Sequence, residues 1–170
     1  HIDGNSRYTD ETVTIKTINF ETADAERVLV EQNSTDGAVR YPHNVTIEDC
    51  TFEGDGADVI VAKFRQGKNI VIKNCNAEVG HSLMQLYGCT NVTVEGVVVE
   101  AGRGISFGTS TNINVKNSYF EAESYGLRAD ATVETALNIE NVAIEANLPV
   151  VARNASKKYA INFAGNNTLD

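Results

Sequence analysis

The chain alternates apolar and polar residues in short runs, and one phrase returns along its length. The copies begin near residues 12, 44, 69, 91, 112 and 136 and read TVTIKTINFE, NVTIEDCTFE, NIVIKNCNAE, NVTVEGVVVE, NINVKNSYFE and ALNIENVAIE. A seventh, partial copy, AINFAG, begins at Ala160. Apolar residues at every second position are typical of a strand with one buried face. A repeat of roughly 22 to 25 residues, longer in the first copy, indicates one coil of a solenoid.

Each repeat predicts three short strands. The first strand places two apolar columns inward, which start at Val13 and Ile15 and end at Ile161 and Phe163. The second strand begins its inward columns at Ile18 and Phe20, and a third apolar stretch closes each coil. No helical period separates the strands, which excludes βαβ units because their crossovers need a helix. The sequence therefore predicts an all-β fold, a single-stranded right-handed parallel β-helix of six to seven coils with three short strands per coil.

A break separates the first two strands of each repeat. The residues there tolerate a left-handed backbone or bond their own main chain, so we expect a turn at Thr17, Asp49, Asn74, Gly96, Asn117 and Asn141. The outward residue just before the break alternates in sign along the chain, in the order Lys16, Glu48, Lys73, Glu95, Lys116 and Glu140. Opposite charges on paired strands attract, so this alternation supports stacking of the repeats in this register.

The repeats account for almost the whole chain, which we interpret as one β-helix domain over residues 1–170. Residues 1–11 are expected to form an N-terminal cap or partial coil, 12–165 the repeats and 166–170 a tail. Solenoids expose a sheet edge at each end and usually cap it, and no capping helix is evident at the C-terminal end. We therefore expect a piece of a longer chain, or coils that stack end to end between molecules.

Charge and cysteine content narrow the possible partners. The formal net charge of −9, from 14 basic and 23 acidic residues, disfavours nucleic acid and anionic lipid. The chain has no run of 18 apolar residues, so the sequence does not predict a membrane-spanning helix. Three cysteines without a CxxC pair do not predict a zinc site. Cys50 and Cys75 share an inward column on adjacent coils, where either a disulfide or two stacked free thiols would fit.

The repeat phrase N-[VI]-x-[VI]-x-N-x-x-[FVI]-E, with Gly104-Ile105 and Gly126-Leu127 opening later strands, resembles the pectate-lyase-like β-helix superfamily. The resemblance covers Thr12 to Gly165. That superfamily contains polysaccharide lyases, glycoside hydrolases, phage tailspikes and adhesins, so the resemblance implies the fold and leaves the activity open.

A narrower resemblance concerns polygalacturonases, whose motifs Asn-x-Asp, Asp-Asp, Gly-His-Gly and Arg-x-Lys lie on successive coils, followed by a Tyr. The corresponding positions here supply the candidate catalytic residues Asp58, His81, Arg103 and Tyr125. His81 would be the near-neutral base. Only Asp58 stands where two acids are expected, and inverting hydrolysis needs an acid and a base carboxylate. The alternative is that all four are ordinary polar turn residues.

A glutamate stands at the same offset in every full repeat, as Glu21, Glu53, Glu78, Glu100, Glu121 and Glu145. Like charges about 5 Å apart in water repel only weakly, so such a row is tolerable. One interpretation is a ladder that binds Ca²⁺ or a cationic ligand, with Glu53, Glu78, Glu100 and Glu121 as candidate metal ligands. The alternative is that each glutamate accepts backbone hydrogen bonds at the next turn or blocks edge aggregation.

Candidate ligand-binding residues are Tyr41, Tyr119 and Arg128. Tyr41, Tyr87, Tyr119 and Tyr125 are the tyrosines that we expect to be exposed. The loop from Glu31 to His43 lengthens the first coil and is a further candidate binding edge. Sugar recognition usually uses a flat ring, and the chain has no Trp, which favours weak multivalent contact.

The sequence favours a non-catalytic, extracellular or cell-surface, adhesin-like module that presents an extended face to carbohydrate or protein. It predicts no cofactor, with Ca²⁺ as the possible exception. The alternative is a polysaccharide lyase or glycoside hydrolase that acts on an acidic polysaccharide such as pectin.

Overall fold

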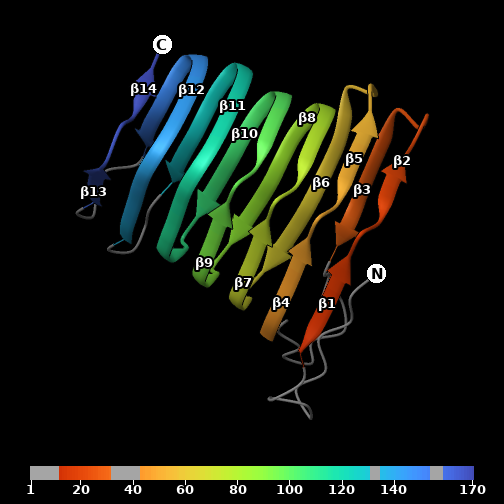
Figure 1. The fold of residues 1–170 in the computed structure, drawn as a ribbon, viewed down its shortest axis with the longest axis horizontal. Coiled ribbons are helices and arrows are strands. Elements are labelled where there is room, and N and C mark those ends of the chain that lie inside the picture. Colours follow the sequence, from red (N-terminus) through yellow and green to blue (C-terminus); the bar gives the residue numbers. More distant parts are fainter. Residues whose placement is uncertain (1–11, 32–42, 131–134, 154–158) are drawn as a thin grey trace.

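The computed structural model describes residues 12–31, 43–130, 135–153 and 159–170, and they form one parallel sheet wound into a solenoid. Figure 1 shows the coils side by side in chain order along the long axis. The strands are β1 (Val13–Lys16), β2 (Asn19–Glu21), β3 (Glu26–Glu31), β4 (His43–Glu48), β5 (Thr51–Gly54), β6 (Asp58–Arg65), β7 (Lys68–Lys73), β8 (Asn76–Tyr87), β9 (Thr90–Glu95), β10 (Val98–Gly108), β11 (Thr111–Asp130), β12 (Thr135–Arg153), β13 (Tyr159–Ala164) and β14 (Thr168–Leu169).

The register of the first strands matches the predicted columns residue for residue. Val13 pairs with Val45, and the row continues through Ile70, Val92, Ile113, Leu137 and Ile161. The described residues make about five turns of solenoid. The predicted six to seven coils, counted from six full copies of the repeat and a seventh partial one, go beyond this number.

The later coils have longer strands than the sequence predicts. In β8, β10, β11 and β12 the expected second and third strands form one continuous element. At this corner a Cβ on Gly80 would lie 2.3 Å from the carbonyl oxygen of Gly56. Adjacent main chains therefore approach closely around the corner. The expectation of three short strands describes only the first two coils, where β1 to β3 and β4 to β6 are separate.

The predicted turn between the first two strands is confirmed by its backbone angles. All six residues of the break adopt a positive φ between 50° and 63°. A second left-handed position, which was not predicted, opens the repeats at Asn44, Asn69, Asn91 and Asn112. Their side-chain amides donate from one coil to the next, over 2.9 Å, 3.0 Å and 2.7 Å. Asparagine suits this position because it tolerates the left-handed region and bonds its neighbour.

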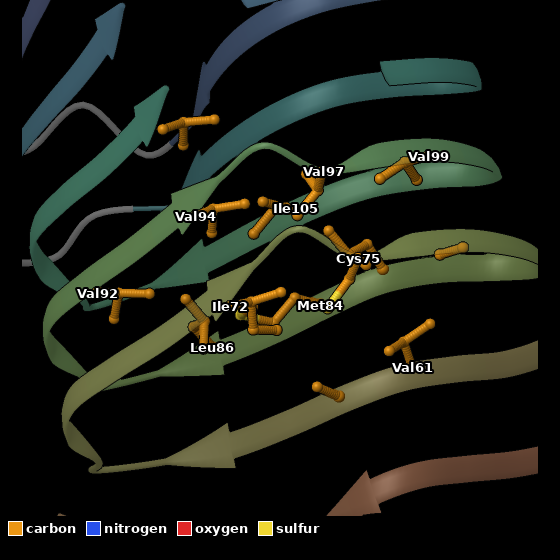
Figure 2. Packing of buried hydrophobic residues seen from close by; sticks show 14 of the residues in the cluster. Val61, Ile72, Cys75, Met84, Leu86, Val92, Val94, Val97, Val99 and Ile105 are labelled. Carbon is orange, nitrogen blue, oxygen red and sulfur yellow. The ribbon is translucent and has the colours of Figure 1, made fainter. Parts of the chain in front are cut away.

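The core consists of the inward columns stacked from coil to coil. Figure 2 shows Ile72, Met84 and Leu86 pointing toward one another inside the solenoid. Two residues expected in this core differ, because Ile18 is 42% exposed and Phe163 is 50% exposed. Both lie in end coils that have a described neighbour on one side only. The inward columns therefore bury their side chains fully only where coils cover them on both sides.

Cys50 and Cys75 are buried free thiols, so the structure has stacked thiols in place of a disulfide. Each thiol donates to a backbone carbonyl two residues earlier, over 3.2 Å in both cases. Burial raises the pKa of Cys75 to about 11. Cys89 is also free and buried, and burial raises the pKa of its thiol. These sulfur atoms act as small core groups.

The alternating charge column forms the predicted ladder on the outer face of the first strands. Glu48 lies between Lys16 at 3.5 Å and Lys73 at 3.0 Å, and Lys116 lies 3.2 Å from Glu95. Exposed pairs of this kind favour one register more than they add stability. No helix in the described ranges is long and apolar enough to span a membrane.

Candidate functional site

A groove of about 1180 Å³ follows the solenoid at the corner between the second and third strand regions. Six successive repeats contribute three consecutive residues each, namely 21–23, 53–55, 78–80, 100–102, 121–123 and 145–147. The first residue of every triplet is the glutamate of the predicted row. The groove is therefore built by the repeat itself and lengthens with each coil.

Small residues hollow out this corner. The second residue of the triplet is buried in the central coils, and it is small at Gly54, Ala101 and Ala122, while Val79 is the larger member. A side chain is excluded at Gly102, where a Cβ would lie 2.6 Å from the carbonyl oxygen of Gly80. With little side-chain volume at the corner, the glutamates stand above a shallow floor.

The glutamate row is confirmed by the strand register. Glu21 pairs with Glu53, and each following member pairs with the next through Glu78, Glu100, Glu121 and Glu145. All six are exposed, and Asp55 and Glu123 add two more carboxylates to the groove lining. No lysine, arginine or histidine is among the described lining residues. The groove is therefore uniformly acidic.

Few protein groups neutralise or bond this row. Asn19 donates to Glu21 over 2.7 Å, and the Tyr119 hydroxyl donates to Glu121 over 3.3 Å. Within the described part of the chain, the side chains of Glu53, Glu78 and Glu100 show no hydrogen bond or ion pair. The alternative in which every glutamate accepts backbone hydrogen bonds is therefore not seen there. Among the same residues, no three His, Cys, Asp or Glu side chains are placed to hold a metal ion, and calcium binding stays a prediction.

A second hollow of about 340 Å³ lies on the other side of the glutamate row. The adjacent outward column of the second strands borders it, with Thr51, Asn76, Val98 and Tyr119 paired in that order. Val98 is 51% exposed, although it lies in the middle of the solenoid. Desolvation and the carboxylates of Glu145 and Glu121 raise the pKa of Tyr119 to about 12. Tyr119 is thus a neutral phenol beside an exposed apolar side chain.

Three of the four candidate catalytic residues lie together. Nη1 of Arg103 lies 2.7 Å from Nε2 of His81, and Nδ1 of His81 lies 2.9 Å from the Ser82 hydroxyl. Asp58, at the start of β6, is near enough for its charge to act on His81. The polar column predicted from the repeat therefore exists over three coils.

The contact with Arg103 determines the state of His81. A guanidinium only donates, so Nε2 must accept and the proton of the neutral ring must sit on Nδ1, which donates to Ser82. Burial and the charge of Arg103 lower the pKa of His81, and Asp58 opposes them. His81 is therefore a neutral imidazole whose Nε2 lone pair already accepts a hydrogen bond from Arg103. That arrangement leaves no nitrogen of His81 open to accept a substrate proton until Arg103 moves.

Tyr125 does not join this cluster. It is only 7% exposed, so the expectation of an exposed tyrosine is wrong at this position. Its ring lies under the guanidinium of Arg128, 5.4 Å from the ring centroid, and Arg128 pairs with Asp130 over 2.6 Å. Arg128 lines neither hollow. Of the other two predicted ligand-binding residues, Tyr119 borders the second hollow, and Tyr41 lies outside the described residues.

Several lining residues were not predicted from the sequence. Asp55 and Glu123 extend the acidic groove, and Asn76 and Val98 complete the border of the second hollow. Val98 carried a usable signal, since an apolar residue at an outward position breaks the alternation of NVTVEGVVVE. The hollows themselves depend on the bend of the chain, which strand alternation does not encode.

Two comparisons with known proteins place the chain in a family. No curated protein sequence matches the chain. The family described as "right handed beta helix region" matches residues 2–168, nearly the whole length. The chain therefore belongs to the right-handed β-helix family, in agreement with the parallel solenoid and its stacked repeats.

Proposed function

We propose that this chain is a non-catalytic, adhesin-like module of an extracellular or cell-surface protein, and that it holds a carbohydrate chain along its acidic groove. The observation that carries the proposal is the continuity of the groove, which receives the same triplet of residues from six successive repeats. A surface that repeats at every coil suits a ligand that also repeats. A protein segment is the alternative ligand for the same face.

The electrostatics of the groove restrict the ligand. Eight carboxylates and no basic side chain line its described part, so an anionic polymer would be repelled. Carboxylates accept hydrogen bonds, and the hydroxyl groups of a sugar donate them. Residues 53, 78 and 100 have acceptor oxygens without partners among the described residues. The groove therefore favours a ligand rich in hydrogen-bond donors.

The test is a glycan array of neutral, amino-bearing and acidic oligosaccharides, read with and without added calcium. We expect binding to a neutral or amino-bearing chain and its loss when Glu78, Glu100 and Glu121 are all replaced by Gln. The matched control replaces Glu95 and Glu140 by Gln, because these glutamates lie on the outer face of the first strands, away from the groove. An array without any bound glycan, at either calcium level, would refute carbohydrate binding.

The second candidate is a lyase or hydrolase that acts on an acidic polysaccharide. One observation favours it, namely the adjacency of Asp58, His81 and Arg103. A lyase needs a base and cations that stabilise an enolate, and His81 and Arg103 are of those types. The engaged lone pair of His81 and the acidity of the neighbouring groove weigh against it.

The two candidates separate in an activity assay. Polygalacturonate, alginate and pectin are incubated with the protein while the absorbance of unsaturated ends and the release of reducing ends are followed. The binding module predicts no turnover. Turnover that disappears in His81→Ala would establish the enzyme and refute the non-catalytic proposal. End-to-end association of coils is a separate proposal, which sedimentation at several protein concentrations tests.

A further inference from the structure

The second hollow differs in character from the groove beside it. Its border combines an aromatic ring, an exposed aliphatic side chain and two uncharged polar groups, from Tyr119, Val98, Asn76 and Thr51. Val98 and Tyr119 are register partners on β10 and β11, so their side chains lie next to each other on the outer face. They form an apolar step in a column that is otherwise mostly polar.

The glutamate row joins this step to the groove. Glu53, Glu78, Glu100 and Glu121 line both hollows, so a ligand can touch the step and the carboxylates together. The Tyr119 hydroxyl is already bonded to Glu121 over 3.3 Å, which fixes the ring beside the row. A volume of about 340 Å³ lies at the lower end of the range for small-ligand sites.

These features match the two sides of a sugar ring. One face of a hexose carries C–H groups that pack on an aromatic or aliphatic surface, and its edge carries hydroxyl groups that donate hydrogen bonds. The step formed by Tyr119 and Val98 suits the face, and Glu100, Glu78 and Asn76 suit the edge. A uronate or sulfate at the same place would bring its negative charge against the glutamate row.

We propose that the step formed by Tyr119 and Val98 is a subsite for one uncharged sugar ring of a neutral polysaccharide, with Glu100 and Asn76 bonding its hydroxyl groups. The proposal rests on the carbohydrate-binding function above and deepens it. It names the ligand class as neutral and places the recognition of the ring on the second-strand face, away from His81 and Arg103.

The test is calorimetric titration of the full chain with neutral hexasaccharides of glucose, mannose, xylose and galactose, and with a galacturonate hexasaccharide of equal length. We expect the best neutral chain to bind at least about ten times more tightly than the galacturonate, because the negative charges of the galacturonate would face the carboxylate row. Tyr119→Ala should weaken the neutral binding about tenfold, and Tyr119→Phe should keep most of it. Tyr87→Ala is the matched control, since Tyr87 is 43% exposed, contacts Arg65 and lies on the third-strand region of β8.

Each outcome decides between the proposals. Neutral binding that survives Tyr119→Ala would overturn the subsite and leave the carbohydrate-binding function in place. If Tyr87→Ala weakens the binding of the neutral chain and Tyr119→Ala does not, the subsite lies on the third-strand face. Tighter binding of galacturonate would overturn the neutral ligand class. Circular dichroism of Tyr119→Ala must match the parent chain, and Val98→Asp provides an independent variant with the same expected loss.

Discussion

Replacing Glu100 with Gln should stabilise the protein, because Glu100 stands between two other carboxylates. Its register partners are Glu78 and Glu121, on strands about 4.8 Å away. With the carboxylates splayed to about 6 Å, each neighbour costs about 0.4 kcal/mol in water at 0.1 M salt. The next members of the row add about 0.3 kcal/mol together, so removal of this charge should raise the free energy of unfolding by about 1 kcal/mol.

Salt and a second substitution make this prediction sharp. At 1 M salt the Debye length falls to about 3 Å and the gain should shrink to about 0.2 kcal/mol. Glu95→Gln is the control with the opposite sign, because Glu95 lies 3.2 Å from Lys116 and pairs in register with Lys73. It should cost up to about 1 kcal/mol at low salt. Urea unfolding followed by circular dichroism at both salt concentrations measures all four values.

A loss of stability in Glu100→Gln at low salt would refute this reasoning. It would mean that Glu100 accepts a structural hydrogen bond, as in the alternative considered for the row. A gain that persists unchanged at 1 M salt would equally contradict it, since the effect would not be electrostatic. The predicted pattern would instead show that the row weakens the fold, which is common where residues are retained for binding.

Three further predictions address other parts of the molecule. Asn91→Ala should lower the free energy of unfolding, measured in urea, by about 2 kcal/mol or more, because it removes two hydrogen bonds between side-chain amides and leaves alanine at a φ of 57°. Asn91→Gly should cost less, because glycine accepts a positive φ. An equal cost for the two variants would contradict the role of the backbone. His81 has a lowered pKa in the fold, so the unfolded chain binds more protons below about pH 6.5 and stability should fall as the pH drops through that range. Urea unfolding at pH 5, 6 and 7 should show that the free energy of unfolding depends less on pH in His81→Gln than in the parent chain. An equal pH dependence in the two proteins would exclude this linkage. Ellman's reagent at pH 8 should react with none of the three buried cysteines in the native protein and with all three in urea; rapid labelling of the native protein would show that a thiol is accessible.

Strand alternation predicted the columns because successive side chains of a strand point to opposite faces, so odd and even positions along the strand lie on different faces. The first-strand row from Val13 to Ile161, the charge ladder and the glutamate row all follow from that rule, and the register confirms them. The break at positions such as Asn74 was predictable because few residues accept a positive φ.

Parity fails where the strand is irregular. The pairing of β11 with β12 shifts register between Ala122 and Tyr125, and the exposed residues 123 and 124 follow each other there. This shift changes which residues face inward, so Tyr125 is buried although its column was expected to be exposed. The contact between Arg103 and His81 depends on the reach of two long side chains, which spacing alone does not determine. The hollow beside Tyr119 likewise arises from the volumes of neighbouring coils.

Because every coil bonds only to the coils before and after it, the number of repeats in the gene determines the length of the groove. Duplicating one repeat in the gene would add one more strand spacing of about 4.8 Å and one further glutamate. Removing one would shorten the surface by the same step without a new core. Selection can thus match the reach of this surface to its target by counting repeats, with no change to any single contact.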